Sequence, residues 1–543
     1  METERGYFGV MLDVSRNAVM SVDELKRFIC VLEKLGYNCL QLYMEDTYEI
    51  VEEPLFGYLR GRYTKQELRE IDGFAKEHNI ELMPCIQTLA HLNQLFKFPK
   101  YDEVRDIADI LLVGEEKTYA LIENMFKNIS DAFSTRKVHI GMDEAHFLGL
   151  GKYLDKNGYR ELFDILLELL NRVCEIAKKY GFEPIMWSDM FFRLAFQGKY
   201  YQKGGVIPDE VKARVPESIE LAYWEYDSKE KEVYDEMLDM HFSFNRETWL
   251  YGGAWKWGGF HSGNVHAFSA IQTAIKACQE KSVKHFMITL WGDDGNETPV
   301  YAVLPALTYA SECYKGNFEI ENAKEKFEAL FHERWDDFLL FDLPIPDTVA
   351  KHPAVKEIVS GAKEWLYNDY FLGKLDSSLS GTGKEREIYA ELAEKLKKAT
   401  SRSSKYKYIF RSYYCLCRLM EIKCDLGYRT RTAYQKKDKD ALKVLLKEYE
   451  IVLRRLRLFE KAFREMWMTD NKPHGFDVQE IRLGGVVART KSCLARITDF
   501  LAGKTEKIEE LEEKTVDYFT GGEPQRQMMI CNSYALLASV NVF

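Results

Sequence analysis

Residues 7–46, YFGVMLDVSRNAVMSVDELKRFICVLEKLGYNCLQLYMED, contain one complete copy of the pattern that decides the fold. An amphipathic stretch at 21–36 lies between two apolar, β-rich runs. Ser21 is a favourable N-cap and Gly36 a favourable C-terminal stop, so this stretch is predicted to be a helix. Near-continuously apolar strands joined by helices are typical of parallel sheets that are buried on both faces. We therefore expect a β–α–β unit here.

The same alternation continues to about residue 315, with eight apolar runs that are each followed by a helix candidate. The runs are residues 7–15, 37–46, 80–91, 137–145, 182–190, 218–227, 245–257 and 284–295. Eight such units close naturally into a (β/α)8 TIM barrel, an α/β fold. The alternative is an open doubly wound sheet. A nucleotide-binding version has little support, because no glycine-rich phosphate loop follows the first run.

Strand-like runs stop at about residue 320, and long charged amphipathic stretches follow. We expect two domains: a catalytic barrel over 1–319 and an all-α C-terminal domain over 320–543. Long helices with exposed Lys and Glu are usually a solvated structural layer. A homodimer interface is a plausible addition.

Composition excludes several classes of function. The 543 residues are 46% hydrophobic and 30% charged, which is ordinary for a globular protein and rules out disorder. A net charge of −11 makes phosphate-mediated binding of nucleic acid a poor candidate. No stretch approaches a membrane span, and the N-terminal segment has no signal-like apolar run. The 11 scattered Cys fit reduced thiols of a cytoplasmic protein. We expect no metal and no cofactor, since no HExxH or Cys-rich metal spacing supports one.

Polar and aromatic side chains gather at the predicted C-terminal ends of the strands, which form the mouth of a barrel. A single Asp there, such as Asp13 or Asp189, has an equally good explanation as a helix N-cap. The whole set is much harder to explain as capping. It comprises Asp13, Arg16, Glu45, Asp46, His91, Asp143, Glu144, Trp187, Asp189, Trp224, Tyr251, Trp255, Trp257, Trp291, Asp293 and Asp294.

This combination suits a sugar. Pyranose rings have apolar faces that stack on Trp, and their hydroxyl groups bind Asp, Glu and Arg. Paired carboxylates can supply acid catalysis and stabilise an oxocarbenium-like transition state. Asp143 and Glu144 leave the sheet together, so both side chains can enter the pocket. His139 is interpreted as a core histidine, and Asp294 and Glu297 have an alternative reading as caps of the helix near Pro299.

The segment His139-Ile140-Gly141-Met142-Asp143-Glu144 resembles the signature of glycoside hydrolase family 20, the β-N-acetylhexosaminidases. The usual form is His-x-Gly-Gly-Asp-Glu, so Met142 is a departure. Segments 366–373 and 471–477 resemble the streptococcal-type exo-β-N-acetylglucosaminidase branch, with its helical C-terminal domain. Family members usually carry a separate N-terminal α/β domain. We expect that domain to be absent here, because the first strand begins near residue 7.

The resemblance implies a retaining, substrate-assisted mechanism through an oxazolinium intermediate. Glu144 is implied as the general acid and base, and Asp143 as the group that holds the acetamido N–H. Tyr251, with Tyr226 as the alternative, is the candidate for the acetamido carbonyl. His91 with Asp46 is the candidate relay to Glu144.

Further residues are implied to bind the substrate, a small glycan with a terminal β-linked GlcNAc or GalNAc. The acetamido group and the ring are assigned to Trp187, Trp224, Trp255 and Trp257. The remaining hydroxyls are assigned to Arg16, Asp293 and Trp291, while Glu45 and Asp46 remain alternatives for binding. Residues of the helical domain, among them Asn368, Asp369 and the 473–482 segment, are candidates to reach the mouth. The competing hypotheses are another two-carboxylate barrel glycosidase and a non-catalytic sugar-binding protein.

Overall fold

Eight parallel strands close into a barrel in sequence order, each paired with its neighbours in the chain and β1 paired with β8. The computed structural model describes residues 6–343, 361–379, 381–516 and 533–541. The strands are β1 Phe8–Asp13, β2 Cys39–Glu45, β3 Glu81–Ile86, β4 Lys137–His139, β5 Glu183–Trp187, β6 Glu220–Trp224, β7 Thr248–Gly253 and β8 His285–Leu290. Each lies within one of the eight predicted runs, so the predicted TIM barrel is confirmed.

The connections that follow the strands contain helices, and the long ones bury one apolar face in the core around the barrel. The helices are α1 Val22–Leu35, α2 Lys65–Glu77, α3 Glu116–Ala132, α4 Lys152–Asn157, α5 Leu162–Lys179, α6 Asp189–Ala195, α7 Asp209–Lys212, α8 Lys231–Phe242, α9 Asn264–Lys281 and α10 Leu304–Tyr314. The predicted caps of α1 are both present. Ser21 accepts a hydrogen bond from the Glu24 amide, and Gly36 ends the helix in the left-handed region at φ 87°.

The interior of the barrel is unusually aromatic. Besides the large core between strands and helices, a second cluster fills the barrel itself and includes Trp187, Trp249 and Tyr251. Trp255, Trp257 and Trp291 extend the same cluster towards the mouth. The aromatic residues therefore divide between ordinary core packing and this second cluster inside the barrel.

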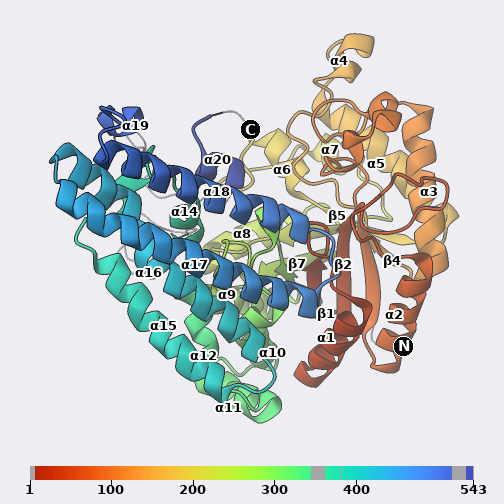
Figure 1. Cartoon of the computed structure of the whole chain (residues 1–543). Coiled ribbons are helices and arrows are strands. Elements are labelled where there is room, and N and C mark those ends of the chain that lie inside the picture. The colour runs from red at the N-terminus through yellow and green to blue at the C-terminus, as the bar shows by residue number, and fades with distance from the viewer. Residues whose placement is uncertain (1–5, 344–360, 380, 517–532, 542–543) are drawn as a thin grey trace.

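The remainder of the described chain is helical. Its helices are α11 Ile320–Phe331, α12 Trp335–Phe338, α14 Gly361–Tyr367, α15 Lys384–Arg402, α16 Lys407–Gln435, α17 Lys439–Asp470, α18 Phe476–Leu501, α19 Glu509–Glu512 and α20 Tyr534–Ala538. Short 3-10 turns connect several of these elements. Figure 1 shows α15, α16, α17 and α18 lying side by side along one flank of the barrel. One continuous core joins both parts, so the helical part is not a loose appendage.

The next observations concern the cysteines, possible metal ligands and possible membrane helices. In the described ranges, ten cysteines are free thiols, and no group of three or more His, Cys, Asp or Glu side chains is placed to hold a metal ion. No helix in the same ranges combines the length and apolar character needed to cross a bilayer.

Candidate active site at the barrel mouth

The corner between β1 and β8 holds a fixed arginine. Asp13, at the end of β1, accepts hydrogen bonds from the Ser15 amide and hydroxyl through Oδ1. Its Oδ2 accepts from the Gly292 amide at 2.9 Å and from Arg16 Nη1 at 3.0 Å. Burial alone would raise the pKa of Asp13, but the charge of Arg16 and these bonds lower it. Asp13 is thus an anchor for Arg16, and a helix-capping role is not needed to explain it.

Arg16 faces the mouth from this anchor. Its Nε lies 3.6 Å from Glu45 Oε1 and 4.0 Å from Asp293 Oδ1. Its guanidinium carbon lies over the rings of Tyr43 and Trp291, at 4.7 and 5.0 Å from their centroids. The structure therefore brings Arg16, Glu45, Asp293 and Trp291 together, as expected from the sequence. Neighbouring sugar hydroxyls can bind here, because the two carboxylates accept hydrogen bonds and the guanidinium donates them.

The connection after β4 has a strained backbone that turns both acidic side chains out of the sheet. Gly141, Met142 and Glu144 have φ values of 71°, 73° and 51°. A Cβ atom on Gly141 would lie 2.0 Å from Gln87 Oε1, so this position requires glycine. Met142, the departure from the usual signature, is fully buried in the same left-handed region. Its cost of about 1 kcal/mol or more is offset by burial of its side chain.

Asp143 is buried and held at both oxygens. Gln87 Nε2 donates to Oδ1 at 2.9 Å, and His91 Nε2 lies 3.0 Å from Oδ2. Burial acts to raise the pKa of Asp143, but the His91 charge and these contacts lower it instead. The lowered pKa favours the ionised form of Asp143, and its two partners fix the direction of its oxygens. That character suits a group that holds an N–H and stabilises nearby positive charge.

His91 lies between both carboxylates. Its Nε2 is 3.8 Å from Glu144 Oε2 as well as 3.0 Å from Asp143. Burial would lower the pKa of the ring, but the charge of Asp143 raises it to about 10. His139, in contrast, is fully buried and accepts from the Gly141 amide, and burial lowers its pKa to about 3. This neutral ring has the core role predicted for it.

In histidine-labelled protein, NMR at pH 8 is expected to show the His91 ring protonated. In Asp143→Asn the His91 pKa should fall, because burial then acts with less opposition. Since an unfolded His titrates near about 6.5, the ion pair contributes its full stability below that pH. The contribution is lost as pH rises through the folded pKa of about 10. A wild-type His91 that titrates near its ordinary value would contradict this ion pair.

Glu144 is more accessible than its neighbour, with 41% of its side chain exposed. Besides His91, it contacts Asp189, which the sequence placed at the mouth without a role, and Arg193, which sequence reasoning did not assign to the site. Its amide donates to Asp189 Oδ2 at 3.2 Å, and its Oε1 lies 3.4 Å from Arg193 Nη2. An exposed carboxylate beside a buried, ionised one is the arrangement needed for a proton donor at a solvent-facing glycosidic oxygen.

Five of the predicted tryptophans belong to one aromatic cluster, in which Trp187 is fully buried inside the barrel and Trp224 is partly buried at its margin. Trp255 and Trp257 stack at 4.2 Å, and the Trp255 indole donates to the Tyr226 carbonyl. Trp224 stacks on Tyr226 at 5.2 Å. Two further tryptophans, Trp187 and Trp291, have ring centroids 6.2 Å apart. These rings provide the flat apolar faces that a sugar or an acetamido methyl would pack against.

The structure separates the two candidate tyrosines. Tyr251 has no exposed surface and donates its hydroxyl to Gln41 Oε1 at 3.1 Å, inside the barrel. Tyr226 is half-buried at the mouth, where its hydroxyl interacts with Trp291 and Thr289 and burial raises its pKa. The placement therefore favours the alternative, Tyr226, for contact with a ligand. A buried tyrosine already bound to Gln41 has little to offer one.

Asp46 does not extend the contact between His91 and Asp143. Arg60 donates to Asp46 Oδ1 through Nε at 3.1 Å and Nη2 at 2.8 Å, and Arg60 also donates to the Ser15 carbonyl. Asp46 follows Glu45, whose left-handed backbone sends the two side chains in different directions. The relay predicted from Asp46 is therefore not formed in this structure. Asp46 instead ties the β2 loop to the β1 loop.

The helical domain reaches the mouth through the loop after β8. Lys363, fully buried, lies 2.8 Å from Glu297 Oε1 and donates to the Asp294 carbonyl. Arg482 of α18 donates to Asp294 Oδ1 at 3.0 Å and to Glu297 Oε1 at 3.3 Å. The reading of Asp294 and Glu297 as helix caps is therefore wrong. Both carboxylates bind cations of the helical domain, next to Asp293.

Arg482 and Val478 also line a cleft of about 290 Å³ together with Arg16, Glu45 and His91. The 473–482 segment thus reaches the mouth as predicted. Asn368 and Asp369 do not, because they bind Asp376 and Arg489 within the helical domain.

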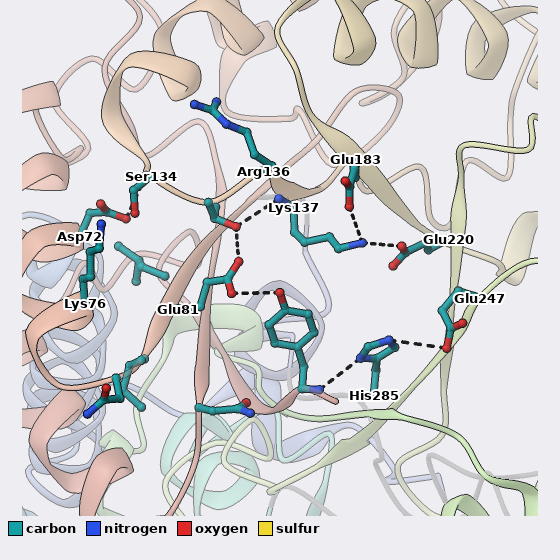
Figure 2. Close-up of a pocket in the computed structure, with 16 residues that line it drawn as sticks. Asp72, Lys76, Glu81, Ser134, Arg136, Lys137, Glu183, Glu220, Glu247 and His285 are labelled. Atoms are coloured by element: carbon teal, nitrogen blue, oxygen red, sulfur yellow. Dashed lines mark hydrogen bonds and ion pairs between the residues drawn. The ribbon is translucent and has the colours of Figure 1, made fainter. Parts of the chain in front are cut away.

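A larger cavity, of about 780 Å³, lies at the opposite end of the barrel, where the strands begin. Figure 2 shows several of its charges paired with one another: Lys137 reaches Glu183 and Glu220, and His285 faces Glu247. In barrels this N-terminal face serves stability, whereas the catalytic groups lie at the other end. The size of this cavity therefore does not make it the active site.

Comparison with known proteins agrees with the geometry. Residues 6–289 match the family model "Glycosyl hydrolase family 20, catalytic domain", and residues 336–530 match "Glycoside Hydrolase 20C C-terminal domain". Hexosaminidase D of Bos taurus is 24% identical over 232 residues, which are 40% of this chain and 62% of that protein. Hexosaminidase D of Homo sapiens is 25% identical over 243 residues, 42% of this chain and 47% of that protein.

Solved structures that match the chain include a β-N-acetylhexosaminidase of Bacteroides fragilis, with 17% identity and a TM-score of 0.44 over 57% of this chain and 65% of that one. A second is the chitobiase of Flavobacterium johnsoniae, with 14% identity and a TM-score of 0.46 over 82% and 75%. The chain spans less than two thirds of the two curated relatives named above. The catalytic-domain match alone covers more than half of the chain, which therefore belongs to glycosyl hydrolase family 20.

Proposed function

We propose that this protein is an exo-acting β-N-acetylhexosaminidase that releases terminal β-linked GlcNAc, or GalNAc, from glycans. The observation that carries the proposal is the unequal pair after β4. Asp143 is buried, ionised and held by Gln87 and His91, whereas Glu144 faces the solvent-accessible mouth. One carboxylate is thus suited to hold a group, and the other to transfer a proton.

The proposed reaction uses the acetamido group of the substrate as nucleophile. Its carbonyl oxygen forms a bond to the anomeric carbon while Glu144 gives its proton to the departing glycosidic oxygen. Asp143 holds the acetamido N–H and balances the positive charge of the oxazolinium ion. Water, deprotonated by Glu144, then opens this ion, so the product keeps the β configuration.

Binding of the sugar is divided between polar and aromatic residues. Arg16, Glu45 and Asp293 surround one side of the mouth and would bind the hydroxyls remote from the reacting bond. Trp255 and Trp257 would enclose the acetamido methyl, and Tyr226 would donate to its carbonyl. Fixed groups of this kind lower the barrier by orientation.

The experiment that tests the proposal is hydrolysis of 4-nitrophenyl β-GlcNAc, followed by proton NMR of the first product formed. We expect turnover with the β-anomer appearing first. An α-anomer would favour an inverting two-carboxylate glycosidase. Tight binding of GlcNAc without turnover would favour a sugar-binding protein and would end the proposal.

Two finer proposals accompany this one. Resemblance of segments 366–373 and 471–477, together with the match to the 20C C-terminal domain, supports placing the chain near the streptococcal-type branch. A homodimer and a cytoplasmic location stay predictions from the sequence.

A further inference from the structure

Glu144 occupies a backbone position that the β4 strand cannot maintain by itself. The residue has a φ of 51°, and Gly141 and Met142 in the same connection are also in the left-handed region. Such a conformation costs of order 1–3 kcal/mol and persists only when its surroundings hold it. Two hydrogen bonds hold the main chain there: the Glu144 carbonyl accepts from the His146 amide at 2.7 Å within the same turn. The Glu144 amide donates to Asp189 Oδ2 at 3.2 Å, and this is the bond that ties the turn to another element.

The same carboxylate oxygen holds an arginine that reaches the other end of Glu144. Arg193 Nε donates to Asp189 Oδ2 at 2.9 Å, one helical turn along α6. Arg193 Nη2 then lies 3.4 Å from Glu144 Oε1. Asp189 and Arg193 therefore contact Glu144 at two points, one on its main chain and one on its carboxylate.

Arg193 is well ordered by its own contacts. Its guanidinium carbon lies 5.7 Å from the Tyr200 ring centroid and 5.9 Å from that of Trp224, and Nη1 donates to the Gly198 carbonyl at 3.2 Å. Only 16% of its side chain is exposed. A planar guanidinium that is stacked and bound on three sides loses little further entropy when it orients a carboxylate.

Helix capping does not account for Asp189. The N-cap of α6 is Ser188, and no side chain makes a capping bond there. Asp189 is nevertheless fully buried, and its Oδ1 has no hydrogen-bond partner among the described residues. Burial, together with the charge of Asp143, raises the pKa of Asp189 to about 7. Burying a carboxylate with one unpaired oxygen lowers the stability of the fold, so we infer that Asp189 has a role beyond packing.

We propose that Asp189 and Arg193 are positioning residues that clamp Glu144 for proton transfer. This inference rests on the proposed function of Glu144. Asp189 holds the main chain in the conformation that aims Glu144 at the leaving oxygen. As the glycosidic C–O bond breaks, the Glu144 proton forms the new O–H bond, and Arg193 stabilises the carboxylate that remains. The later transfer of a proton from water to Glu144 uses the same contact in reverse.

The test compares two substrates with the same sugar, whose leaving groups differ in their need for an acid. The departing phenol of phenyl β-GlcNAc must be protonated, whereas 3,4-dinitrophenolate leaves without a proton. In Arg193→Gln and Asp189→Asn we expect kcat to fall about a hundredfold for the phenyl substrate, the scale of a displaced catalytic group. The rate of forming the oxazolinium intermediate from the dinitrophenyl substrate, measured in the burst phase, should change less than about threefold, because acid assistance is weak there.

Three further measurements separate positioning from folding. Arg193→Lys keeps the charge but not the stacked plane, and it should recover only part of the phenyl rate. Arg214→Gln removes an arginine that pairs with Asp164 on the surface, away from Glu144, and should match wild type on both substrates. Thermal unfolding and the dissociation constant for GlcNAc are expected to stay near wild-type values in the position-193 variants.

The outcomes distinguish this inference from the proposed function. Wild-type protein that hydrolyses neither substrate would end both. The clamp would be overturned if wild type is active and the variants lower the rates on both substrates equally, or lower neither rate. The proposed function would remain intact in both cases. If Asp189→Asn fails to fold, the two Arg193 variants decide the question by the same ratio of rates.

Discussion

Glu144→Gln is expected to lower kcat for phenyl β-GlcNAc by about 10²–10⁴-fold, the usual contribution of a general acid or base. Glutamine has nearly the same shape and keeps contact with Arg193, but it has no proton to give to the departing oxygen. The effect should be smaller for formation of the intermediate from the dinitrophenyl substrate, whose leaving group needs no acid. Steady-state and burst-phase kinetics measure the two cases.

The matched control for this variant is Glu161→Gln. Glu161 is an exposed glutamate on the same connection between β4 and α5, and its side chain makes no capping bond to α5. It should retain wild-type activity on both substrates. Undiminished turnover of the phenyl substrate by Glu144→Gln would exclude Glu144 as the acid.

A phenyl β-glucoside is expected to react about 10⁵-fold more slowly than phenyl β-GlcNAc, the scale of the effective molarity of a well-placed internal nucleophile. The glucoside lacks the carbonyl oxygen that attacks the anomeric carbon, and Asp143 has no N–H to hold. Asp143→Asn should remove most of the advantage of the N-acetyl substrate, because a neutral amide cannot balance the oxazolinium charge. The ratio of kcat/KM values for the two sugars measures both effects.

The accompanying control varies the acyl group at nearly constant size, from acetyl to fluoroacetyl to trifluoroacetyl. Electron withdrawal weakens the carbonyl nucleophile, so the rate should fall steadily along this series. Equal rates for the N-acetyl sugar and the glucoside, or a rate that does not change along the acyl series, would contradict the internal nucleophile. The attacking group would then be an enzyme carboxylate or water.

The barrel could be predicted because its evidence is local and repeated. Each strand is an apolar run of a few residues, and each helix has the 3.6-residue periodicity that a single stretch of sequence displays. Position at a strand end is also local, so the sequence by itself places Arg16, Asp143 and Trp291 at one mouth. Parallel strands in a closed barrel leave few other places for such residues.

The pairing of side chains at the mouth was not predictable in the same way. Asp46 and Glu45 are adjacent, and only the left-handed backbone at Glu45 decides that Asp46 turns to Arg60. Tyr251 and Tyr226 were both candidates, and only the packed barrel shows Tyr251 bonded to Gln41. Differences of this kind depend on one or two backbone angles, which the sequence pattern does not record.

The pairing of cations from other helices with the site carboxylates was not predicted, although the 473–482 segment was expected to reach the mouth. These cations are Arg193, Lys363 and Arg482. They belong to helical stretches in which the sequence pattern predicts that an arginine or lysine faces solvent. Nothing in their spacing indicates that they reach Glu144, Asp294 and Glu297. The contact of Arg482 with the β8 loop joins residues that are 188 positions apart in the chain.

Periodicity and end position in the sequence were thus sufficient for the barrel, the helical domain and the set of side chains at the mouth. They depend on repeating, short-range preferences of the backbone and on apolar burial. The tertiary structure alone decided which carboxylate is buried and which is exposed, which tyrosine is free to meet a ligand, and that α6 and α18 supply cations to the site. These properties depend on distances between segments far apart in the chain, and such distances exist only once the chain has packed.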